Sequence, residues 1–161
     1  MFKAQHVFFA LLILLMSQSA FAATATANLP VNASVAAVCV FGNITSVNFG
    51  SFTGTQNDAT GSIEVTCNPT VAYTIGLNQG TGTGGTTSLR VMTGTPTGTL
   101  AYQLFQNVGR TTNWGNNPPT DTVNSTGTGL VQLFTVYGRI PAGAVPAPGS
   151  YNDTVLITVT Y

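Results

Sequence analysis

The chain has 161 residues, of which 5% are charged, and its formal net charge is zero. Its single lysine and single histidine lie within the first six residues, so the remainder carries three arginines against four acidic residues and has no basic face for nucleic acid. A surface this poor in charge suits either a protein in lasting contact with copies of itself or an exported β domain solubilised by threonine, asparagine and glycine.

The first 22 residues have the features of a secretory signal peptide. Lys3 precedes an apolar run over 7–16, and Ala20-Phe21-Ala22 forms a small-x-small cleavage site. The apolar run is shorter than the roughly 20 residues that a membrane-spanning helix needs. We therefore expect a soluble, exported chain that begins at Ala23 and does not span a membrane.

The next segment, residues 23–35, alternates between apolar and polar side chains. A period of two predicts a strand with one buried face, and the apolar face comprises Ala25, Ala27, Leu29, Val31, Ala33 and Val35. Pro30 lies on the polar side, which favours an edge strand or an added strand because proline donates no ladder hydrogen bond. From periodicity alone, the segment is expected to be the first strand of its own sheet.

The two cysteines, Cys39 and Cys67, are expected to form a disulfide, as cysteine pairs in exported proteins do. The closed loop would stabilise the fold by about 3.5 kcal/mol in the chain-entropy model. A metal site is the alternative, but it needs further ligands, and no histidine follows His6. No metal or other cofactor is expected.

The rest of the chain consists of short predicted strands separated by glycine and proline, at 44–49, 61–67, 71–77, 89–92, 99–105, 130–140 and 151–161. Asn68-Pro69 would make 68–70 a hairpin loop if the strands on either side are neighbours. Residues 107–129 are loop-rich, and no segment has a helical period. This pattern predicts a single antiparallel β-sandwich over residues 36–161, with barrel closure as the alternative.

The last predicted strand alternates as clearly as the segment at 23–35. One of its faces carries Val155, Ile157, Val159 and Tyr161. Because the strand runs to the final residue, no downstream segment is expected to pair with its other edge.

Six sequence blocks occur in an order that is specific in combination: VTCN at 65–68, YTIGLN at 73–78, RTTNWG at 110–115, TG at 128–129, VYGRIP at 136–141 and GSYNDTV at 149–155. Together they resemble the spore coat protein U family, which includes the fibre subunits of Csu-type, archaic chaperone–usher pili. The resemblance covers nearly all of the chain after residue 22. It implies an incomplete immunoglobulin-like antiparallel β-sandwich that a donor strand from another subunit completes.

The resemblance also implies partners. A periplasmic chaperone would lend the missing strand, and at an outer-membrane usher the N-terminal extension of the next subunit would replace it by β-strand addition. The donor residues would be the apolar face of 23–35, and the acceptor groove would be edged by Val155, Ile157, Val159 and Tyr161. The implied role is a structural subunit of a surface pilus, exported through the periplasm, that serves adhesion and biofilm formation.

Two alternatives come from other features. Arg110, Trp114 and Asp121 could form a loop platform for a sugar, as in a monomeric secreted carbohydrate-binding module, although we expect them to pin the loop and to plug the end of the sandwich. A structural protein of a spore or cyst coat is the second alternative. An enzyme is not expected, because the four acids are unpaired in the sequence and no histidine is left to act as a base.

Overall fold

The computed structural model describes residues 22–161, so the predicted signal peptide lies outside the described residues except for Ala22. These residues form nine strands: β1 (Cys39–Thr45), β2 (Asn57–Cys67), β3 (Ala72–Leu77), β4 (Arg90–Thr95), β5 (Thr99–Phe105), β6 (Val123–Thr126), β7 (Gln132–Ile140), β8 (Ser150–Asn152) and β9 (Ile157–Thr160). Within residues 22–161, nothing forms a helix of the length and apolarity that a membrane span requires.

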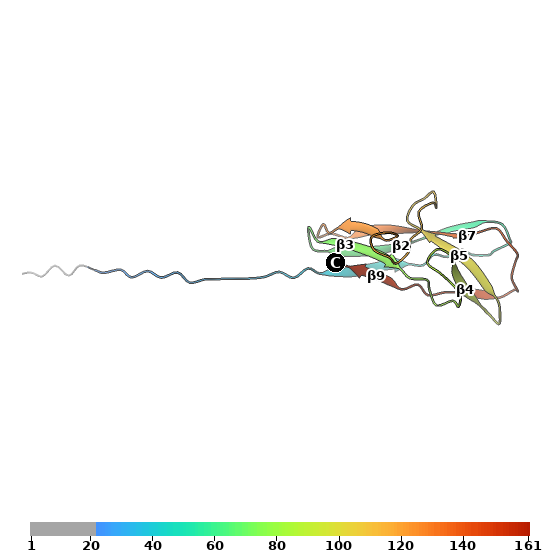
Figure 1. Cartoon of the computed structure of the whole chain (residues 1–161), viewed down its shortest axis with the longest axis horizontal. Helices are drawn as coiled ribbons and strands as arrows, with labels where there is room; N and C mark the ends of the chain where they lie inside the picture. Colours follow the sequence, from blue (N-terminus) through green and yellow to red (C-terminus); the bar gives the residue numbers. More distant parts are fainter. Residues whose placement is uncertain (1–21) are drawn as a thin grey trace, which may run out of the picture. The chain divides into compact units, whose positions relative to one another are not determined.

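The strands build two antiparallel sheets, as the alternating pattern predicted. The larger sheet has the order β1-β2-β7-β5-β4-β8 and the smaller has the order β6-β3-β9. Strand β9, which leads to the C-terminus, lies beside β3 (Figure 1). Four strands of the described chain therefore have an edge without a ladder partner: β1 and β8 in the large sheet, and β6 and β9 in the small one. The end of β1 and the start of β9 line the same cavity.

The core lies between the sheets because alternate residues of each strand point inward. From β2 it receives Ile63, Val65 and Cys67, and from β3 it receives Tyr73, Ile75 and Leu77. Polar residues such as Ser62 and Glu64 alternate with them and are only partly buried. This is the physical basis of the period of two that predicts both strands.

A buried arginine ties the small sheet to the loops around it. Arg90 at the start of β4 has no exposed surface, and its guanidinium donates hydrogen bonds of 2.7–2.8 Å to the carbonyl oxygens of Leu77, Asn78, Thr87 and Trp114. Burial lowers the pKa of Arg90 from its usual value. Its role is to satisfy carbonyl groups where three segments of chain meet away from water.

Four strand predictions differ from the structure. The strand predicted at 44–49 lies earlier in the chain, as β1, and residues 46–49 belong to no strand. The segment predicted as one strand over 151–161 forms two strands in different sheets: β8 pairs with β4, and β9 pairs with β3. Residues 68–70 do not form a hairpin loop, because β2 and β3 belong to different sheets. The short strand β6 lies in the region predicted to be loop-rich, where it pairs with β3.

The segment before β1 is described by itself. Residues 22–38 belong to no strand and are exposed, and contacts within the chain place a boundary between Ser34 and Val35. The exposed fraction of the side chain is 85% for Leu29 and 86% for Val31. The interpretation of 23–35 as a donor strand remains a prediction.

Candidate functional site

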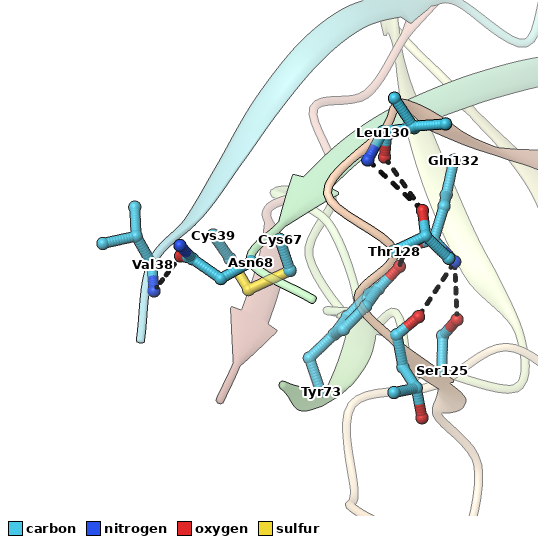
Figure 2. Close-up of a disulfide and its surroundings, with 10 residues drawn as sticks. Val38, Cys39, Cys67, Asn68, Tyr73, Ser125, Thr128, Leu130 and Gln132 are labelled. Carbon is cyan, nitrogen blue, oxygen red and sulfur yellow. Dashed lines mark hydrogen bonds between the residues drawn. A yellow bond between two sulfur atoms is a disulfide. The ribbon is translucent and has the colours of Figure 1, made fainter. Parts of the chain in front are cut away.

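The disulfide predicted from the two cysteines is confirmed. Cys39 at the start of β1 lies opposite Cys67 at the end of β2, with the Cα atoms 4.1 Å apart. Beyond it, the backbone N–H of Val38 donates to Asn68 Oδ1 at 2.9 Å (Figure 2), and the N–H of Asn68 donates to the Val38 carbonyl at 3.1 Å. The β1–β2 pairing thus continues one residue past the disulfide.

An open groove of 960 Å³ reaches into the space between the sheets. Its floor consists of core side chains from both sheets: Ile63, Leu77, Met92, Leu100, Tyr102, Leu104, Val136 and Ile140. A β domain whose core is open to solvent along a groove leaves apolar area unburied, which costs about 25 cal/mol for each Å². A ligand with apolar side chains would recover part of that free energy.

One wall of the groove is the chain that leads into and through the start of β9. Val155 and Ile157, which the family resemblance proposes for the acceptor edge, line the groove, and both pack partly against the core. Val159 also packs against the core but does not line the groove, and Tyr161 is 57% exposed and lies outside it. Of the four residues proposed for the acceptor edge, Val155 and Ile157 lie at the groove, whereas Val159 and Tyr161 do not.

The other wall, residues 44–52, was not predicted as part of the site. Val47, Phe49 and Phe52 point inward from this segment, which has no ladder partner in the described chain after Thr45. The segment can lie close to the large sheet because the strands beneath it carry glycine: a Cβ on Gly61 would lie 2.9 Å from Val47 Cγ2, and one on Gly138 would lie 2.6 Å from Val47 Cγ1.

The end of this second wall is held by a side chain of β2. Asn57 donates from Nδ2 to the carbonyl oxygens of Phe49 at 2.7 Å and Ser51 at 3.3 Å. The ring of Phe49 meets Tyr102 edge-to-face, with centroids 6.2 Å apart. The end of β1 and the start of β9, each with one unpaired edge, thus border one groove with an apolar floor, which is the arrangement that an added strand requires.

A polar network borders the groove at the start of the first wall. Asp153 Oδ2 accepts a 2.6 Å hydrogen bond from the Tyr102 hydroxyl, and Oδ1 accepts bonds from the backbone N–H and the hydroxyl of Thr81 and from the N–H of Thr154. Burial would raise the pKa of Asp153, but these hydrogen bonds outweigh it and hold the pKa below 3.8. Burial, followed by the bond to Asp153, raises the pKa of Tyr102.

Replacing Asp153 with asparagine is expected to lower the free energy of unfolding by about 1–2 kcal/mol at pH 7, because the amide cannot accept all four hydrogen bonds. The folded pKa of Asp153 is depressed, so its contribution is present above the unfolded value and lost as pH falls through the lower folded value. Urea unfolding at pH 7 and pH 3 should show a smaller acid loss in Asp153→Asn than in the wild type. An equal acid loss in both proteins would contradict this role.

Each residue of the predicted loop cluster is held by other partners. Trp114 is 1% exposed and donates from Nε1 to the Ile75 carbonyl at 2.8 Å, so its indole offers no open face to a sugar. Arg110 forms a 3.3 Å ion pair with Asp58 and lies over the ring of Tyr137. Asp121 accepts a hydrogen bond from the backbone of Asn117 within its own loop.

The sequence is similar to a known domain family and to a protein of another organism. The Spore Coat Protein U domain family model matches residues 25–158. Protein U of Myxococcus xanthus is 35% identical over 156 residues, which cover 87% of this chain and 87% of that protein.

A solved structure is also similar. It is a chain in the crystal structure of the CsuC–CsuE chaperone–tip adhesion subunit pre-assembly complex from archaic chaperone–usher Csu pili of Acinetobacter baumannii. The TM-score is 0.57 at 25% identity, and the likeness covers 79% of this chain but 40% of that chain, so this chain spans less than half of its length. With the two antiparallel sheets, this likeness confirms the predicted immunoglobulin-like β-sandwich.

Proposed function

Because the chain belongs to the Spore Coat Protein U domain family, we propose that it is a structural subunit of a surface pilus assembled through the chaperone–usher pathway. A periplasmic chaperone occupies the groove first, and the N-terminal segment of another subunit replaces it at an outer-membrane usher. The finished pilus serves adhesion and biofilm formation. The similarity to a chain from a chaperone–subunit complex of Csu pili supports this proposal.

The observation that carries the proposal is the groove of 960 Å³ between two unpaired edges, in a chain that also contains an alternating apolar segment. An added strand would form backbone hydrogen bonds with these edges and place every second side chain in the groove. The side chains so placed would be those of Ala25, Ala27, Leu29, Val31, Ala33 and Val35.

Leu29 and Val31 are expected to contribute most to this binding, because they are the two largest side chains in the middle of the donor face. Full burial of each would stabilise the assembled state by about 1.5–3 kcal/mol. The alanines contribute less area and allow the strand to lie close to the floor.

Deletion of residues 23–31 is expected to abolish fibres while binding to the chaperone persists, because the deletion removes the donor face and leaves the groove intact. Electron microscopy of surface material and co-purification with the chaperone measure the two properties. Fibres built by the deleted form would rule out the donor assignment. Electron microscopy would also distinguish a fibre from a spore or cyst coat.

A matched pair of variants tests how much each face of residues 23–35 contributes to polymerisation. Leu29→Asp with Val31→Asp places charge on the face that enters the groove and should stop polymerisation. Asn28→Asp with Asn32→Asp adds the same charge to the opposite face and should leave polymerisation close to that of the wild type. Equal loss in both variants would mean that charge, rather than burial of one face, determines assembly.

A further inference from the structure

The last residue before the disulfide is held by two hydrogen bonds. Val38 uses both its N–H and its carbonyl group to bind Asn68, at 2.9 and 3.1 Å, and the next residue is Cys39, which is bonded to Cys67 (Figure 2). Both backbone groups of Val38 are therefore directed toward the β2 side of β1. Val38 is consequently fixed in the extended pairing that continues β1.

The proposed function creates a competition within each chain. A donor segment joined to its own groove by a short linker has an effective concentration in the millimolar range. At micromolar protein concentration, a chain able to fill its own groove would do so before it met a second copy. Assembly into a fibre therefore requires a feature that opposes this internal reaction.

To fill its own groove, the segment would have to reverse direction and run back along the free edge of β1. The pairing of Val38 with Asn68 withdraws that residue from any turn, and the donor face extends to Val35, so the reversal must occur at residues 36–37. These are Ala36 and Ala37, and tight hairpin turns need residues that adopt positive φ, mostly glycine, asparagine or aspartate. The local sequence therefore opposes the turn.

We infer that Asn68, together with the Cys39–Cys67 disulfide, is a positioning device that keeps the N-terminal segment out of its own groove and so makes a second copy of the chain the occupant. The disulfide fixes Cys39 against Cys67, and Asn68 extends that constraint by one residue to Val38. This inference rests on the proposed function. It adds an explanation of why the N-terminal segment does not fill the groove of its own chain.

The test uses the chain from Ala23 to Tyr161 and a synthetic peptide of residues 23–35 as the probe. The variant Ala36→Asn, Ala37→Gly, Asn68→Ala supplies a turn and removes the side-chain oxygen that accepts from the Val38 N–H, while the backbone bond from residue 68 to the Val38 carbonyl remains. It should remain monomeric by light scattering and take up the peptide at least tenfold more slowly than the wild type. The control Ala36→Asn, Ala37→Gly retains Asn68 and should polymerise and bind the peptide as the wild type does.

Three results would overturn the inference, and they are distinguishable. Wild-type behaviour of the triple variant would show that the constraint on Val38 has no effect. A monomeric control would show that turn residues alone decide the outcome and that Asn68 has no part in it. A wild-type chain that neither polymerises nor binds the peptide would refute the proposed function, and the inference with it.

The disulfide content and Trp114 fluorescence of each variant report whether the domain has folded. Should the triple variant fail to fold, Asn68→Ala alone provides the test. Without the side-chain bond to the Val38 N–H, its polymerisation should be at least threefold slower than that of the wild type, and an unchanged rate would overturn the inference.

Discussion

Replacing Arg90 with methionine is expected to lower the free energy of unfolding by about 3–5 kcal/mol. Methionine fills a similar volume but donates no hydrogen bond, so four carbonyl groups near a fully buried site lose their partner at once. Each buried polar group left unsatisfied costs about 1–3 kcal/mol, and partial relaxation keeps the total below the sum. Urea unfolding of the chain from Ala23 measures the change.

Two further variants identify the cause of this loss. Arg90→Lys keeps the charge but lacks the planar fork of donors, so it should recover only part of the stability. Arg139→Met removes an arginine from an exposed pair with Asp58 and should cost less than about 1 kcal/mol. A loss in Arg90→Met no greater than that in Arg139→Met would show that the four carbonyl groups find other partners.

Replacing both Cys39 and Cys67 with alanine is expected to lower the free energy of unfolding by about 3.5 kcal/mol, because the crosslink joins residues 28 positions apart and restricts the unfolded chain. Urea unfolding of the double variant and the wild type gives the difference directly. The same variant should bind the peptide of residues 23–35 more weakly, since β1 leads into the second wall of the groove.

Chemical reduction of the wild type provides the control for this double substitution. Reduced wild type should lose stability by a similar amount without any change of side-chain volume beyond the broken bond. A large loss in the double variant with no loss on reduction would assign the effect to packing of Cys67, which is buried, rather than to the crosslink.

The sequence was sufficient for features that depend on neighbouring residues. Alternation over 61–67 and 71–77 predicted two strands because each has one face in the core. The two cysteines predicted the disulfide because the sequence contains no third cysteine, and no histidine after His6 that could join them in a metal site. Val155 and Ile157, proposed for the acceptor edge on the family resemblance, line the groove, and their role as that edge stays a prediction.

Features that depend on distant residues were not predictable in this way. The run at 151–161 divides at Asp153, whose partners Tyr102 and Thr81 lie 51 and 72 positions away. The second wall of the groove depends on Gly61 and Gly138, and neither glycine has a sequence context that points to Val47. Arg90 resembles a surface charge until the carbonyl groups around it are known.

The disulfide also determines how the domain would carry a pulling force. Tension applied to the chain before Val38 reaches Cys39, and the disulfide ties Cys39 to Cys67, so the backbone over 40–66 cannot be drawn out while the crosslink holds. This bypass spares the irregular β1–β2 register between Phe41 and Ile44 and delivers the load to the end of β2, which has nine registered pairs with β7. Residues 44–52 lie within the spared stretch. In a pilus under load, the backbone of that groove wall would keep its length while the fibre is stretched.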